Sequence, residues 1–72
     1  MASYSYRPAS SNIEQVDFDD ATDTLTITFT GGDEYDYMNV PVSLYRQMQA
    51  APSAGQFFHR QIKGRYQYDG PK

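Results

Sequence analysis

The stretch TLTITFT, residues 24–30, decides the fold because it alternates polar and apolar side chains over its whole length. Successive side chains of a β-strand point to opposite faces, so Leu25, Ile27 and Phe29 share one face and the threonines share the other. The stretch therefore predicts a strand with one buried face. Threonine is common on the wet face of a strand, so the other face is either ordinary surface or an open face or edge for a partner segment.

The segments on both sides of this strand extend it into an antiparallel sheet. Residues 13–18 predict a preceding strand, and the acidic run at 19–23 has the composition of a turn. Two glycines at 31–32 close the next hairpin, since glycine tolerates the positive φ of tight turns, and residues 34–40 predict a third strand. The side chains that these flanking strands turn toward the core are Val16, Phe18, Tyr35 and Tyr37.

The chain after the third strand predicts two short helices. Pro41 suits the first position of a helix, where its missing N–H costs nothing, and Ala51-Pro52 ends that helix. A capping-box pattern at residues 53–56 starts a second helix that runs to about Lys63, and Gly64 suits the left-handed position after it. The apolar residues at helical spacing are Leu44, Tyr45 and Met48 in the first helix and Phe58 and Ile62 in the second.

The predicted order β-β-β-α-α gives an α+β fold, a three-stranded antiparallel β-meander packed against two short α-helices. Residues 13–68 form this domain. Residues 1–12 are polar, contain Pro8 and show no apolar period, so we expect a flexible N-terminal arm. Residues 69–72 form a C-terminal tail.

Charge is unevenly distributed along the 72 residues, whose net charge is −3. Residues 1–37 hold eight acids and one base, while residues 38–72 hold five bases and one acid. Such asymmetry suggests a polyanion or a charged protein surface as partner. Apolar runs fall short of the roughly 20 residues of a membrane span, and the first residues lack the apolar core of a signal peptide. We therefore expect a cytoplasmic protein with no membrane partner.

The residue types give little support to a catalytic or metal-binding site. The chain has no cysteine and one histidine, His59, with no second ligand or carboxylate near it in sequence. A calcium loop starting at Asp17 would need glycine at its sixth position and glutamate at its twelfth, but Thr22 and Thr28 stand there. We expect no catalytic residues, no metal and no cofactor, and hence a binding module rather than an enzyme.

The most informative segment for function is residues 57–68, FFHRQIKGRYQY. It holds Arg60, Lys63 and Arg65 within six residues, beside Tyr66 and Tyr68. Positive charge binds phosphates and aromatic faces stack on unpaired bases, which favours contact with RNA. The tyrosines could instead pack on the sheet, and a protein partner could use the same arginines and tyrosines.

Residues 11–68 resemble the KTSC domain, a short module found alone in bacterial and phage proteins and at the C-terminus of some lysyl-tRNA synthetases. The resemblance lies in an ordered set of motifs. They are Ser11-Asn12-Ile13, Tyr35-x-Tyr37, Val40-Pro41, Ala51-Pro52-Ser53-x-Gly55 and Phe57-Phe58-x-x-x-Ile62-x-Gly64-x-Tyr66. It implies an RNA-binding role and brings no catalytic residues. Under this interpretation the chain is a stand-alone RNA-binding module.

The whole chain also looks like small phage-encoded transcription regulators that bind bacterial RNA polymerase, inhibit initiation and promote antitermination. We take such regulation as the favoured function and the stand-alone RNA-binding module as the alternative. That likeness implies a monomer in the bacterial host cytoplasm that contacts the N-terminal region of the largest polymerase subunit, near the RNA exit channel. The expected polymerase contacts are Tyr4, Tyr6, Arg7, Asp17, Asp19 and Asp36. The expected RNA-proximal residues are Arg60, Lys63, Arg65 and Tyr66.

Overall fold

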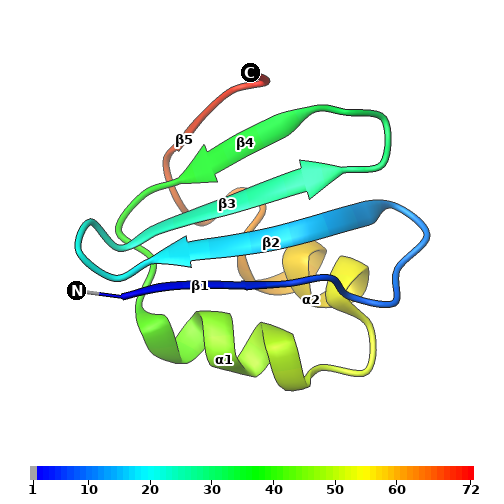
Figure 1. Cartoon of the computed structure of the whole chain (residues 1–72), viewed down its shortest axis with the longest axis horizontal. Helices are drawn as coiled ribbons and strands as arrows, with labels where there is room; N and C mark the ends of the chain where they lie inside the picture. Colours follow the sequence, from blue (N-terminus) through cyan, green and yellow to red (C-terminus); the bar gives the residue numbers. More distant parts are fainter. Residues whose placement is uncertain (1) are drawn as a thin grey trace.

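The computed structural model describes residues 2–72, which form one antiparallel sheet with two helices on one of its faces (Figure 1). The five strands lie in sequence order across the sheet. They are β1 (Ser3–Tyr6), β2 (Ile13–Asp19), β3 (Thr24–Phe29), β4 (Glu34–Tyr37) and β5 (Tyr68–Asp69). The helices are α1 (Val42–Ala50) and α2 (Ala54–Gln61). The predicted α+β class and the antiparallel arrangement are confirmed.

The prediction of three strands is wrong, because the sheet gains an edge strand from each end of the chain. Residues 3–6, which we expected in a flexible arm, form β1 and pair with β2. Tyr4 and Tyr6 explain why this segment is ordered, since their rings pack against Tyr45 of α1 at centroid distances of 5.9 and 5.8 Å. At the other end β5 pairs with β4, so the expected tail from residue 69 begins inside a strand.

The register of the sheet separates an inner face, under the helices, from an open face. On the inner face one row of side chains crosses all five strands: Tyr4, Phe18, Leu25, Tyr37 and Tyr68. The alternation predicted for residues 24–30 is confirmed, because Leu25 and Ile27 are fully buried while Thr24, Thr26 and Thr28 remain partly exposed. Between Ile13 and Gln15 the register of β2 shifts, so Glu14 is an extra residue in a bulge.

The core lies between the inner face and the two helices. Tyr45 of α1 stacks on Phe18 at 5.5 Å, and Phe58 of α2 meets both Phe29 and Tyr37 edge-on at 5.5 Å. The buried hydrophobic side chains are Ile13, Val16, Phe18, Leu25, Ile27, Tyr37, Val40, Tyr45, Met48, Ala54, Phe58 and Ile62. Large aromatic rings thus supply much of the buried area in a chain with few residues to spare.

The helix ends largely follow the sequence signals. Ser53 caps α2, and its side chain accepts a hydrogen bond from the Gln56 N–H, as the capping-box pattern predicted. Gly64 has the predicted left-handed backbone, with φ of 78°. Pro41 lies one residue before α1 rather than at its first position, and α2 ends at Gln61, two residues earlier than expected. In residues 2–72 no helix is long and apolar enough to cross a membrane.

Candidate nucleic-acid interface

The start of α2 is held against the loop before β2 by a close contact that leaves no room for a larger residue. Gly55 is buried, and a Cβ placed there would lie 2.9 Å from the Asn12 side-chain oxygen. Glycine therefore allows the helix backbone to approach Asn12. Two of the motifs quoted above, at residues 11–13 and 51–55, meet at this contact, which fixes where α2 lies on the sheet.

The end of α2 is a hydrogen-bonded turn that holds three basic residues together. The N–H groups of Ile62 and Lys63 both donate to the Phe58 carbonyl, at 3.0 and 2.9 Å. After Gly64 the chain turns back, and the Arg65 Nε donates to the Arg60 carbonyl at 2.9 Å. Arg65 thus satisfies a carbonyl at the end of the helix while its own charge stays at the surface.

Arg60, Lys63 and Arg65, which we call the basic patch, are all exposed. Within residues 2–72 the ion pairs involve only Lys72, so no carboxylate neutralises the patch. One turn carries all three bases, from Arg60 at the end of α2 to Arg65 after Gly64. Their free charges are available to an anionic partner.

Exposed aromatic surface lies beside Arg65, one member of the basic patch. Tyr68 is 57% exposed, and its ring leans against Tyr35 and Tyr37 at 5.7 and 5.6 Å. Tyr66, which we expected near RNA, is only partly exposed and packs against the core. Both tyrosines line a shallow groove of about 580 Å³. Its other lining residues are Met38, Gly64, Arg65 and Gln67.

Tyr68 is the residue that the sequence prediction left out of the site. The spacing of Tyr66 and Tyr68 places both on one side of an extended segment, and only Tyr66 belongs to the family motif. The structure distinguishes them, because β5 is the last strand of the sheet and the Tyr68 ring has no further strand to cover it. A second groove, of about 270 Å³, lies beside Arg60 and is lined by Phe57, Ser53 and Gln56 among others.

The open face of the sheet carries the opposite charge. Its central row runs across the strands as Ser5, Asp17, Thr26, Asp36 and Asp69. Asp36 accepts hydrogen bonds from Lys72 Nζ and Thr26 Oγ1, each at 2.7 Å, and the Lys72 bond holds the pKa of Asp36 below its ordinary value. Lys72 also approaches Asp69 at 3.5 Å, so one base partly offsets two of the carboxylates.

The residues expected to contact the polymerase do not form one surface. Asp17, Asp19 and Asp36 belong to the open face, whereas Tyr4 and Tyr6 point to the inner face. The Tyr6 hydroxyl is buried and has no hydrogen-bond partner in residues 2–72, and burial raises the pKa of Tyr6 to about 12. Arg7 is exposed in the loop after β1. Tyr4 and Tyr6 therefore pack against the core in this structure.

Metal-ligating groups do not gather anywhere in the part of the chain that the structure describes. No three of its histidine and carboxylate side chains lie close enough to hold an ion. His59 is exposed, and its ring lies edge-on to Phe58 at 5.7 Å. The charged and aromatic groups near the end of α2 therefore remain the strongest candidate site.

Comparisons with known proteins identify relatives over most of the chain. The lysine–tRNA ligase of Trichormus variabilis is 38% identical over 63 residues, and that of Nostoc punctiforme 40% over 63. These regions cover 88% of this chain but only 11% of each ligase. A protein of Tsukamurella paurometabola is 39% identical over 57 residues, which cover 79% of this chain and 85% of that protein.

A solved structure and a family model agree with these relatives. The crystal structure of a KTSC domain protein from Yersinia pestis superposes with a TM-score of 0.85 and 30% identity, covering 94% of this chain and 96% of that one. The model of the KTSC domain matches residues 9–66, which include the Asn12–Gly55 contact, α2 and the basic patch. The chain belongs to the KTSC domain family.

Proposed function

We propose that this domain is an RNA-binding module, not an enzyme, and that it binds through the basic patch and the groove beside it. The observation that carries the proposal is the turn at residues 60–65, which holds three unpaired positive charges and whose Arg65 lines the same groove as the exposed Tyr68. Three of the relatives are lysine–tRNA ligases, whose name gives tRNA as a substrate, and an RNA-binding domain suits such enzymes.

The physical basis of the proposed binding is charge next to an aromatic ring. Phosphates attract Arg60, Lys63 and Arg65, and release of their counterions drives binding. The Tyr68 face offers a stacking surface for an unpaired base, worth about 1–3 kcal/mol in proteins that bind single strands. The surface is shallow rather than enclosed, which suits an extended strand better than a small substrate.

An NMR titration of the ¹⁵N-labelled chain with short single-stranded RNA tests this function. We expect shifts concentrated on residues 57–68 that weaken as salt is added, because the contacts are mainly to phosphates. A Tyr68→Ala variant should reduce affinity without changing the salt dependence, since it removes stacking and no charge. An unchanged spectrum at millimolar RNA would contradict the proposal.

The acidic open face favours a second candidate function, regulation of bacterial RNA polymerase by a phage protein. Asp17, Asp19 and Asp36 would contact a basic polymerase surface near the RNA exit channel, while the basic patch would face the transcript. Tagged protein should then retain polymerase subunits from a bacterial lysate, and an Asp17→Lys, Asp19→Lys variant should lose them. An eluate without polymerase would remove this candidate. Both functions would be carried out in the bacterial cytoplasm.

A further inference from the structure

The outer edge of β1 presents free backbone groups. The Asp20 N–H donates to the Ala2 carbonyl at 3.0 Å, and β1 pairs with β2 in the register that sets Ser3 opposite Asp19. Hydrogen-bond directions alternate along an antiparallel strand, so the N–H and C=O groups of Ser3 and Ser5 point away from β2. In residues 2–72 these groups meet no backbone partner. The edge is therefore a template for one more strand.

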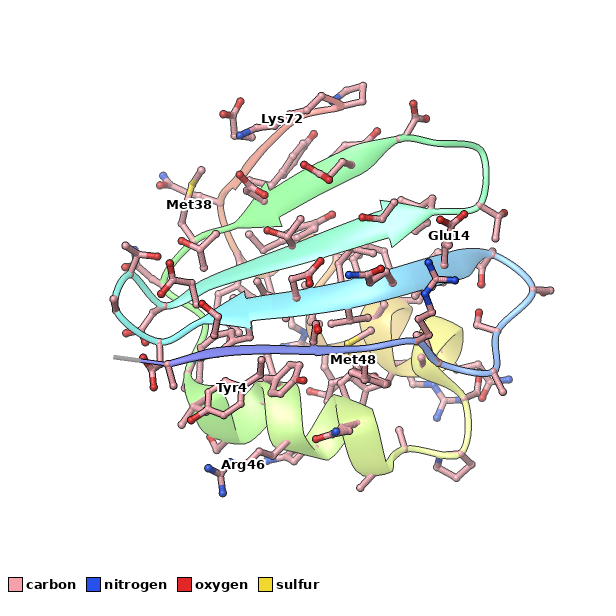
Figure 2. All side chains as sticks on the ribbon, in the orientation of Figure 1. Tyr4, Glu14, Met38, Arg46, Met48 and Lys72 are labelled. Atoms are coloured by element: carbon pink, nitrogen blue, oxygen red, sulfur yellow. The ribbon has the colours of Figure 1, made fainter. Side chains whose placement is uncertain are left out.

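At the opposite end of the sheet, the segment that carries β5 covers β4 and brings Asp69 and Pro71 to the edge. The Lys72 N–H donates to the Glu34 carbonyl and the Met38 N–H to the Gln67 carbonyl, both at 2.9 Å. Figure 2 shows Lys72 on the outer side of β4. By contrast β1 has neutral serine and tyrosine side chains, with no proline or charged residue within the strand. β1 is short and has α1 beside it, but unlike β5, which contains Asp69, it has no charged residue within the strand.

A groove runs along the β1 edge beside α1, which we call the edge groove. It has a volume of about 460 Å³ and is lined by Ser3, Tyr4, Ser5, Tyr45, Arg46 and Gln49. Figure 2 shows Tyr4 between β1 and α1, and Arg46 extending from α1 into solvent. Arg46 is the only charged residue in this lining and pairs with no carboxylate in residues 2–72. The groove thus combines an aromatic surface with a free positive charge.

We propose that the β1 edge and the edge groove bind an extended peptide by strand addition, with an acidic side chain of the peptide pairing with Arg46. The backbone of the peptide would bond to Ser3 and Ser5, as in other cases where a segment adds to a sheet edge. Alternate peptide side chains would enter the groove, where a carboxylate can form a charge-assisted pair with the guanidinium.

Charge also determines what the other row of peptide side chains can be. That row continues the open face beside Ser3 and Ser5, one strand away from Asp17 and Asp19. A carboxylate there would be repelled, whereas hydroxyl or basic side chains are compatible. The edge therefore selects a segment in which acidic or apolar residues alternate with hydroxyl or basic ones.

Charge complementarity favours such a peptide over a second copy of this chain. The β1 segment of another molecule would present Tyr4 and Tyr6 to the edge groove and bring no carboxylate to Arg46. It would also bring a second Arg46 close to the first. A peptide with an acidic side chain would bond to the free backbone groups of Ser3 and Ser5 and also pair with Arg46.

NMR titration of the ¹⁵N-labelled full chain with the capped peptide Thr-Val-Lys-Glu-Thr-Val-Lys tests the proposal. Its glutamate and valines fall on one row, and its threonines and lysines on the other. We expect saturable shifts in residues 3–6 and α1, and slower hydrogen exchange of the Ser3 and Ser5 amides. The same peptide with lysine in place of glutamate should bind at least about tenfold more weakly, since it loses the charged pair.

Two variant pairs separate recognition from loss of structure. Ser5→Pro removes an N–H that the fold does not use and should abolish binding, whereas Ser5→Ala keeps that N–H and should bind normally. Arg46→Glu should reject the glutamate peptide and accept the lysine-substituted one, while Gln47→Glu on the same helix should leave the affinity for both peptides unchanged. Shifts that persist in both Ser5→Pro and Arg46→Glu would overturn the proposal. So would a silent titration at millimolar peptide, or a dimer in sedimentation without peptide.

Discussion

Replacing Phe58 with alanine is expected to lower the free energy of unfolding by about 3–5 kcal/mol, because it empties the centre of the aromatic core. Phe58 is 4% exposed and meets Phe29 and Tyr37 edge-on, so the substitution removes both packing and two favourable ring pairs. A domain of this length is stable by about 4–11 kcal/mol in total. The substitution should therefore remove a large fraction of the total stability and move the unfolding midpoint to a much lower urea concentration.

Urea denaturation followed by circular dichroism measures this loss, and Phe57→Ala provides the matched control. Phe57 is the neighbouring phenylalanine on the same helix but is only partly buried, so its truncation leaves a smaller cavity. We expect it to cost less than half as much as Phe58→Ala. A loss below about 1 kcal/mol for Phe58→Ala would mean that α2 turns a different face to the sheet.

The sequence predicted those parts of the fold in which local pattern and tertiary packing agree. Leu25 and Ile27 alternate with threonines because one face of β3 is buried, and the period of the strand records that burial. Ser53 and Gly64 mark the ends of α2 through backbone geometry that depends on few neighbours. Such signals can be interpreted without knowing what lies across the core.

The two edge strands were missed because contacts distant in sequence stabilise them. Residues 3–6 alternate serine and tyrosine, but a four-residue pattern in a polar segment is too short to predict a strand. Tyr4 and Tyr6 become ordered by packing on Tyr45, which lies in the first helix. The same contacts separate the two tyrosines from Asp17 and Asp19, so the expected polymerase surface could not be assembled from sequence position alone.

The sequence indicated the basic residues of the candidate site but not its exposed aromatic residue, Tyr68. Helical spacing and the glycine turn bring Arg60, Lys63 and Arg65 together, and both features can be identified in the sequence. The exposure of Tyr68 depends instead on β5 being the edge of the sheet, which only the strand pairing reveals. The clustering of the basic residues can thus be predicted from their spacing in the sequence, whereas the exposed tyrosine face can be predicted only from the order of the strands.

Reversing the basic patch with Arg60→Glu, Lys63→Glu and Arg65→Glu is expected to weaken binding of single-stranded RNA at least about 100-fold, because it replaces three phosphate contacts with repulsion. For single strands each contact contributes roughly 0.7 to the slope of log affinity against log salt, so the native chain should show a slope near −2. The variant should lose this slope. Fluorescence anisotropy with labelled RNA at several salt concentrations measures both quantities.

A pair of double variants distinguishes the patch from the net charge of the chain. Arg60→Glu with Lys63→Glu, and Arg7→Glu with Arg46→Glu, each replace two positive charges with two negative ones, which changes the net charge from −3 to −7. The first pair keeps the Arg65 bond to the Arg60 carbonyl, so the end of α2 should remain folded. If the patch binds RNA, only the first pair should lose most of the affinity and salt dependence. Equal losses in both pairs would mean that RNA responds to overall charge, and the turn at residues 60–65 would then have no specific role in binding.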